Sequence, residues 1–175
     1  MCSLEKYRID LLGLKADTET FEFHLDDDFF KAVEGRDVQH GDVKATVCVT
    51  KVGNDFKMAM GVQGSVIVPC DLCLEDMEQP VEGTNNLTVK LGVEYAEEDD
   101  TVTVDERDGF IDTSWFLYEM IVLAIPIKHV HEPGKCNPAM MKALEEHSVA
   151  RSSGGEQPVD PRWSELEKLK TILND

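Results

Sequence analysis

Four residues with metal-ligating side chains occur in two short motifs of this sequence. Cys70 and Cys73 form a C-x-x-C pair at the end of an apolar run, and His131 and Cys136 form an H-x4-C pair further along the chain. A structural zinc ion needs four soft or borderline ligands in a tetrahedron, and a C-x-x-C turn supplies two thiolates. Cys136 is the candidate third ligand, and His131 is the leading candidate for the fourth. The alternative histidines for the fourth position are His129 and His147. A zinc ion bound by this set would staple a later loop to the end of a hairpin.

Two other interpretations of the cysteine pair remain open. In a thioredoxin-like redox pair, the motif opens a helix whose N-terminus lowers the thiol pKa. The stretch PCDLCLEDMEQP shows no such helix and carries four carboxylates that disfavour a thiolate. In the remaining interpretation, Cys70 and Cys73 pack as small apolar residues. Cys2 and Cys48 are expected to take no part, since Cys48 lies on the strand face opposite its neighbouring valines.

The elements that would position these motifs begin with strands that have one apolar face. Apolar and polar residues alternate at 7–11, at 21–25 and most clearly at 43–49, a period typical of a half-buried strand. The turn GND at 53–55 reverses the chain, and the return strand carries apolar residues of one parity over 58–70. The pattern predicts a long hairpin with Cys70 at the edge of the core face.

Later segments predict shorter strands and two helices. A strand is expected at 87–93, after CLEDMEQPVEG, and another at 101–106, after the charged loop EYAEEDD. A short helix is predicted between an N-cap at Asp26 or Asp27 and Gly35, and a mostly buried helix between Asp112 or Thr113 and Pro126. The ends of the two helices are marked by these cap residues, Gly35 and Pro126. Glu119 is a carboxylate in the middle of the second helix. We expect Glu119 to find a structural partner.

The fold class that follows is α+β: a mainly antiparallel sheet with a long hairpin, one central buried helix and a helical C-terminal part. The sequence predicts an α+β core domain at 1–135, a short helix at 136–147 and a flexible linker at 148–159. An amphipathic helix is expected at 160–173, opened by the cap-and-proline pair DP. Its apolar stripe includes Trp163, Leu166 and Leu169, which would either fold back on the sheet or bind a partner.

The charge balance limits the classes of partner. The chain has 175 residues, with 35 acidic and 17 basic side chains, for a formal net charge of −18. Such a field repels nucleic-acid phosphates and anionic membranes and attracts basic proteins. The N-terminal residues MCSLEKYRID do not read as a secretory signal, and five cysteines in such a chain favour reduced thiols in the cytoplasm.

Sequence signals for catalysis are weak. The carboxylates in and after the acidic loop lack a scaffold that would converge them on Mg²⁺ for a nuclease; they are Asp99, Asp100, Asp105, Glu106 and Asp108. The stretch GVQGSV is not followed by the Lys-Ser/Thr pair of a phosphate-binding loop. We therefore expect a protein that is not an enzyme.

Four features occur in a fixed order along the chain. They are the hairpin ending in C-x-x-C-L-E, the acidic loop followed by a helix ending in LAIP, the H-x4-C motif, and DPRWSELEKLK near the end. This order resembles the YceD family, bacterial and plastid proteins linked to accumulation of large-subunit ribosomal RNA and also catalogued as domain of unknown function 177. The resemblance covers roughly residues 41 to 173.

The resemblance implies a soluble, non-catalytic factor of ribosome assembly. Leu72 stands where members commonly carry arginine, and Cys136 stands alone where some carry a second close cysteine pair. Together with the charge, the resemblance predicts a cytoplasmic factor in large ribosomal subunit biogenesis. We expect it to bind a basic ribosomal or assembly protein within a pre-ribosomal particle. Its contact with rRNA should be indirect or weak, and it should have none with membranes. The alternative is a zinc-stapled RNA-binding or RNA-processing module. Zinc is the one candidate cofactor.

Overall fold

The computed structural model describes residues 4–147. By compactness, residues Met1–Lys142 form one unit and Ala143–Asp175 a second. The predicted linker and C-terminal amphipathic helix, including Trp163, Leu166 and Leu169, lie outside the described residues and stay predictions.

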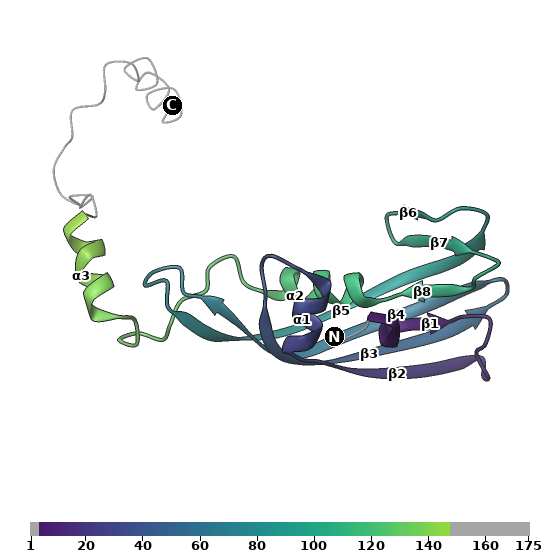
Figure 1. The fold of residues 1–175 in the computed structure, drawn as a ribbon, viewed down its shortest axis with the longest axis horizontal. Helices are drawn as coiled ribbons and strands as arrows, with labels where there is room; N and C mark the ends of the chain where they lie inside the picture. Colours follow the sequence, from purple (N-terminus) through teal and green to yellow (C-terminus); the bar gives the residue numbers. More distant parts are fainter. Residues whose placement is uncertain (1–3, 148–175) are drawn as a thin grey trace, which may run out of the picture. The chain divides into compact units, whose positions relative to one another are not determined.

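The first unit is built around a six-stranded sheet, which confirms the predicted α+β class (Figure 1). In spatial order its strands are β2 (Thr18–Leu25), β3 (His40–Val52), β4 (Asp55–Pro69), β5 (Asp76–Gly92), β7 (Thr101–Asp105) and β6 (Ala96–Glu98). All neighbours pair antiparallel except β5 and β7, which are parallel. The sheet is therefore mixed, though mainly antiparallel.

The long hairpin of β3 and β4 follows the predicted pattern. Val52 pairs with Asp55 across a two-residue turn in which Gly53 has φ +65°, the left-handed region that suits glycine. The apolar residues of one parity on both strands are buried, and the Cys48 side chain on the other face is half-buried. Gly64 is needed where the two strands lie close, because a Cβ there would stand 2.6 Å from the Cα of Val43.

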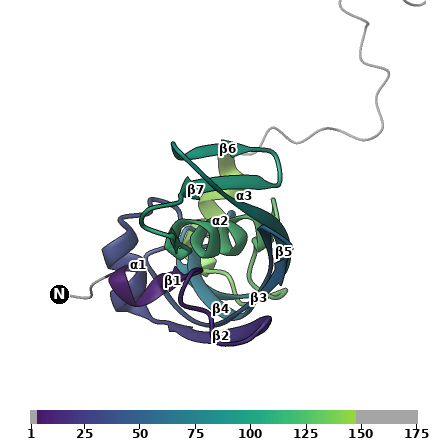
Figure 2. The ribbon, with the colours of Figure 1, turned by 90° about the vertical axis from the view of Figure 1, so that its right-hand side faces the viewer.

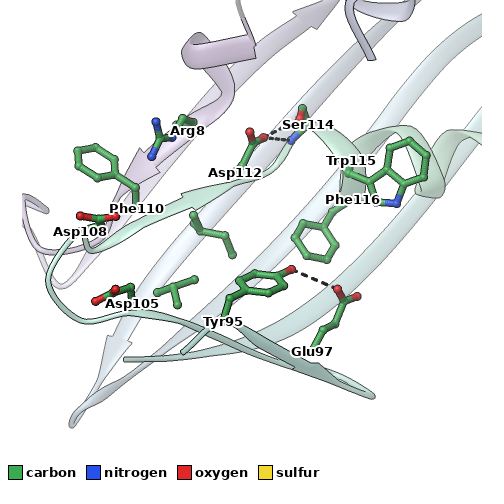
Figure 3. Close-up of a pocket in the computed structure, with 12 residues that line it drawn as sticks. Arg8, Tyr95, Glu97, Asp105, Asp108, Phe110, Asp112, Ser114, Trp115 and Phe116 are labelled. Carbon is green, nitrogen blue, oxygen red and sulfur yellow. Dashed lines mark hydrogen bonds between the residues drawn. The ribbon is translucent and has the colours of Figure 1, made fainter. Parts of the chain in front are cut away.

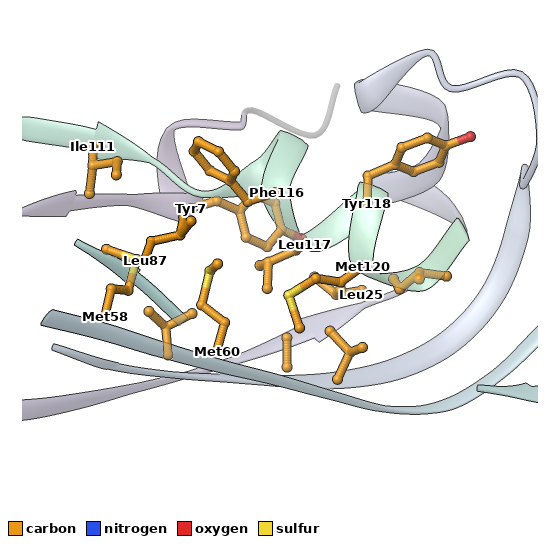
Figure 4. Close-up of a cluster of buried hydrophobic side chains, with 14 of the residues drawn as sticks. Tyr7, Leu25, Met58, Met60, Leu87, Ile111, Phe116, Leu117, Tyr118 and Met120 are labelled. Atoms are coloured by element: carbon orange, nitrogen blue, oxygen red, sulfur yellow. The ribbon is translucent and has the colours of Figure 1, made fainter. Parts of the chain in front are cut away.

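Helix α2 (Ser114–Ala124) fills the hollow of the curved sheet and packs on β4 and β5 (Figure 2). Its buried side chains, including Leu117 and Met120, meet Met58 and Met60 of the sheet in one apolar cluster (Figure 4). The same cluster extends along the long strands, from Val68 near the end of β4 to Val104 on β7.

A small second sheet completes the cover of the core. Strands β1 (Arg8–Asp10) and β8 (Phe110–Asp112) pair antiparallel, and the 3₁₀ helix η1 (Leu4–Tyr7) precedes β1. Ile9 and Ile111 face each other in this ribbon and are both buried. Thr113 donates its hydroxyl to the Tyr7 carbonyl at 2.7 Å, which ties the start of α2 to the N-terminal segment.

The helix caps decide between the predicted alternatives. Asp26 is the N-cap of α1 (Asp27–Val33), and its Oδ1 accepts from the Phe29 N–H at 3.2 Å. For α2 the N-cap position is Thr113, but the capping carboxylate is Asp112, which accepts from the Ser114 N–H at 2.9 Å and hydroxyl at 2.6 Å. The C-cap of helix α1 is Glu34 (φ 56°), one residue before the glycine at which the sequence predicted the helix to end.

One strand prediction and one loop prediction were wrong. Strand β5 begins at Asp76, well before the predicted 87, and contains Pro80, which pairs opposite Ser65. Proline is compatible with this position because, within the described residues, no strand pairs with the other edge of β5 before Thr88, so the nitrogen that lacks a hydrogen can face an open edge. The stretch EYAEEDD, predicted to be a loop, contains the three-residue strand β6.

The last described helix is α3 (Pro138–His147), which falls within the segment 136–147 where the sequence predicts a short helix. Asn137 precedes it, and its Oδ1 accepts from the Ala139 N–H at 2.9 Å and the Met140 N–H at 3.3 Å. None of the described helices has the length and apolar character needed to cross a membrane.

Candidate functional site

The C-x-x-C motif lies in the turn that joins β4 to β5. Cys70 follows the last residue of β4, and the Cys70 N–H donates to the Glu75 carbonyl at 2.9 Å, which closes the turn. Leu74 takes the left-handed conformation (φ 60°) and its N–H returns to the Cys70 carbonyl at 2.9 Å. No helix follows the motif, since the chain enters β5 at Asp76. The redox interpretation therefore lacks the helix N-terminus that it requires.

The second motif reaches this turn through a reciprocal pair of contacts. The Asp71 N–H donates to the His129 carbonyl at 3.0 Å, and the His129 N–H donates to Asp71 Oδ2 at 2.8 Å. The His129 ring also lies against Asp71, with Nε2 3.6 Å from Oδ1. These contacts dock the segment after α2 onto the hairpin turn and bring His131 and Cys136 to the cysteine pair.

The four predicted metal-ligating residues converge. One ligand atom from each of Cys70, Cys73, His131 and Cys136 lies within 4.8 Å of the others. Cys70 Sγ is 3.8 Å from Cys136 Sγ, and His131 Nδ1 is 3.3 Å from Cys73 Sγ and 3.9 Å from Cys136 Sγ. Within residues 4–147, this is the one such group of histidine, cysteine and carboxylate side chains.

These distances fit a tetrahedral zinc site. Sulfur ligands about 2.3 Å and a nitrogen ligand about 2.0–2.1 Å from one zinc ion lie about 3.8 Å (S–S) and about 3.5 Å (S–N) apart at tetrahedral angles. The three separations given above depart from these values by a few tenths of an ångström, and all six lie within 4.8 Å. Cys70 and Cys73 are buried, and His131 and Cys136 are half-buried. The donor set and its spacing therefore fit a structural zinc ion.

The hydrogen bonds around Cys70 favour its thiolate, which is the form that binds a metal ion. Burial disfavours the charged form of Cys70, but the N–H groups of Cys73, His131 and Leu72 donate toward its sulfur, and the net effect lowers the thiol pKa to about 6. Burial and the neighbouring Cys70 and Cys73 thiols raise the pKa of Cys136 to about 11. A bound cation would offset the mutual repulsion of the thiolates, because metal ligands must be deprotonated.

The remaining predicted candidates take other roles. His129 orients the loop: its Nδ1–H donates to the Pro126 carbonyl at 3.0 Å, while Nε2 faces Asp71. His147 ends α3 and is not in the group of four. Glu119 is exposed and accepts from Trp115 Nε1–H at 2.7 Å, so its predicted structural partner is an exposed tryptophan.

Sequence reasoning missed two features of the site and its surroundings. One is Asp71, whose role depends on a loop 58 residues away. The other is a pocket near the opposite end of β5, bordered by aromatic rings and carboxylates (Figure 3). No local motif marks this pocket, because its residues come from β1, β8, α2 and the chain around β6 and β7.

Comparison with known proteins identifies a family. The family model described as Large ribosomal RNA subunit accumulation protein YceD matches residues 58–170. No curated protein and no solved structure shows significant similarity to the chain. The matched segment contains both halves of the Cys-His group and begins later than the position near 41 expected from the sequence features. Because it covers more than half of the chain, the chain belongs to the YceD family.

Proposed function

We propose that the chain is a non-enzymatic factor in large ribosomal subunit biogenesis, and that it supports accumulation of large-subunit rRNA by binding a basic ribosomal or assembly protein in the cytoplasm. The family description supplies the process. The choice of partner depends on the distribution of charge over the first unit.

The observation that carries this choice is an acidic segment at 94–112, which we call the acidic end. It holds nine carboxylates and a single basic residue, Arg107. Most of these carboxylates are exposed, and none forms an ion pair within the described part of the chain. A concentration of uncompensated negative charge attracts cationic proteins and raises their association rate, and it repels the phosphates of bare RNA.

The Cys-His group supports a structural role for zinc in this proposal. Its four protein ligands would fill a tetrahedral site and leave no open position for a substrate or a reactive water. A zinc ion there would hold the segment after α2 to the hairpin turn. Its binding energy would contribute to the stability of that region, because the ligands are unassembled in the unfolded chain.

The experiment that tests the proposal compares two purified probes. The full chain, loaded with zinc, is titrated with the mixed proteins of the large ribosomal subunit and, separately, with protein-free large-subunit rRNA. We expect capture of one or more basic proteins, with an affinity that falls as salt rises, and no saturable binding of the rRNA. Tight, salt-sensitive binding to protein-free rRNA would overturn the choice of partner and favour the zinc-stapled RNA-binding module instead.

A further inference from the structure

The acidic end contains a pocket of about 600 Å³ between strands β7 and β8 and the start of α2 (Figure 3). Pockets of roughly 300–1,000 Å³ are typical of sites that enclose a small ligand or a side chain. Four aromatic rings and four carboxylates border it: Tyr95, Phe110, Trp115, Phe116, Glu97, Asp105, Asp108 and Asp112. Buried Val104 and Ile111 contribute the remaining apolar surface.

Three of the aromatic rings are unusually exposed for residues of their size. Tyr95 is 63% exposed, Trp115 52% and Phe110 43%. Exposed aromatic rings grouped around one pocket are typical of a binding surface. Leaving large apolar rings in water is unfavourable, and a partner that buries them recovers this free energy. The exposed parts of these rings are therefore available to a partner, and Tyr95, the most exposed of the three, offers the most surface.

The carboxylates that border this pocket have no cationic partner in the described residues. Glu97 accepts from the Tyr95 hydroxyl at 3.2 Å, and Asp112 accepts from Ser114. Asp105 Oδ1 accepts from the Arg107 N–H at 2.8 Å. These donors are neutral groups, and no lysine or arginine in residues 4–147 forms an ion pair with Glu97, Asp105, Asp108 or Asp112.

One wall of the pocket already holds a guanidinium group. The Arg8 guanidinium carbon lies 5.2 Å from the centre of the Phe110 ring, within the range of a cation–π contact. Arg8 offsets one of the four carboxylates, so the pocket remains negative. The rings of Tyr95 and Trp115 have no such cation over them in the described residues.

We propose that this pocket binds an arginine side chain of a basic protein partner, with the guanidinium stacked on the Tyr95 ring and its N–H groups donating to the carboxylates that border the pocket, Asp105 and Asp108 among them. Arginine fits better than lysine, because its planar group stacks on aromatic faces while its five donors reach carboxylates at the edge. The inference rests on the proposed function, since it specifies how the acidic end recognises its basic partner.

The test uses hexa-arginine and hexa-lysine peptides as probes, titrated into the full, zinc-loaded chain. Both peptides carry the same charge, so long-range electrostatic attraction alone would give them equal affinity. Binding in the pocket should raise the affinity for hexa-arginine about three- to five-fold above that for hexa-lysine. Tyr95→Leu removes a ring and should abolish most of this preference, and Tyr95→Phe, which keeps the ring, should retain it. Asp108→Asn should weaken hexa-arginine binding several-fold more than Glu22→Gln, an equal charge change on β2 at the far edge of the sheet.

A second readout locates the bound peptide. The indole N–H resonance of Trp115, assigned by its loss in Trp115→Phe, should shift in a saturable way with hexa-arginine. Equal affinity for the two peptides, or equal effects of Asp108→Asn and Glu22→Gln, would overturn the inference.

The two proposals fail separately. If large-subunit proteins bind but Tyr95→Leu and Asp108→Asn behave like the wild type toward hexa-arginine, only the pocket inference is lost. If hexa-arginine passes these tests and no large-subunit protein binds, the proposed function is wrong and the pocket remains a site for another arginine-bearing partner.

Discussion

The two ends of strand β5 gather ionisable side chains in different ways. β5 begins at Asp76, three residues after Cys73, and its last residue, Gly92, pairs with Asp105 of the pocket. At the thiol end, the ligand atoms lie within 4.8 Å of one another, with Cys70 and Cys73 buried. At the acidic end, the carboxylates are spread around a pocket, and all of those that border it except the half-buried Asp105 are exposed to solvent.

This difference distinguishes a group suited to holding a metal ion from a surface suited to binding a protein. Buried, converging thiolates would be stabilised by a cation, because deprotonated thiols packed together repel one another and the low dielectric strengthens that repulsion. Spread carboxylates are solvated and stable without an ion, so their charge remains available to a partner. Convergence and burial, rather than the amount of charge, distinguish the two ends.

The largest effect is expected from the core that both ends share. Leu117 is fully buried on α2 beneath the sheet. Leu117→Ala should lower the free energy of unfolding by about 2–5 kcal/mol, since the substitution leaves a cavity in the core, and should loosen both ends together. Urea unfolding measures this loss. A decrease in the free energy of unfolding below about 1 kcal/mol would contradict the claim that Leu117 belongs to a core on which both ends depend.

A large effect confined to one end is expected from Cys70→Ser. The wild-type chain should contain about one zinc ion and the variant almost none, because a serine hydroxyl is a poor substitute for a thiolate ligand. Elemental analysis gives the metal content, and Cys48→Ser is the matched control, since Cys48 lies on β3 outside the group.

Hydrogen exchange locates the same change. In Cys70→Ser the amides of Asp71 and Leu74, which are hydrogen-bonded in and around the turn, should exchange faster, while those of Leu11 and Thr113 should not change. Metal-free wild-type protein that keeps full protection at Asp71 would contradict the zinc assignment.

A smaller effect is expected from Asp71→Asn. Asp71 does not touch the metal position but fixes the loop through His129. Loss of such a supporting group weakens zinc binding by about tenfold or more, which competition with a zinc chelator would measure. Asp76→Asn is the control for charge, because Asp76 is exposed at the start of β5. Equal losses in the two variants would mean that only local charge matters.

The smallest effect is expected from Asn137→Ala. Asn137 caps α3 and donates its Nδ2–H to Glu75 Oε1 at 2.6 Å. Loss of an N-cap side chain costs about 1 kcal/mol, so the Ala139 and Met140 amides should exchange faster while the zinc content stays the same. A drop in zinc content would show that the cap and the metal site are coupled.

Local sequence patterns predicted the hairpin and the four cysteine and histidine side chains that come together. Period-two alternation defines which residues of β3 and β4 are buried, and the C-x-x-C and H-x4-C spacings select the four side chains that converge. In both cases the signal is carried by residues close together in the sequence. Asp71 was missed because its partner lies in a distant loop.

The pocket could not be predicted in the same way. It requires β1 to pair with β8 and β7 to pair in parallel with β5, and neither pairing follows from local alternation. Arg8, Tyr95 and Trp115 lie far apart in the sequence and meet only in the folded chain. For the same reason the early start of β5 was missed, since Pro80 reads as a strand breaker until the unpaired edge is known.

The most direct test of the central claim is to neutralise the same number of carboxylates at the acidic end and elsewhere on the molecule, and to measure how each variant binds large-subunit proteins. Glu98→Gln/Asp99→Asn/Asp100→Asn removes three carboxylates at the acidic end, and Glu22→Gln/Asp37→Asn/Glu82→Gln removes three elsewhere, so the net charge of the two variants is equal. We predict that the first variant loses most of the salt-dependent affinity and the second stays close to the wild type. Equal losses, or none in either variant, would contradict the claim that the acidic end recognises the basic partner.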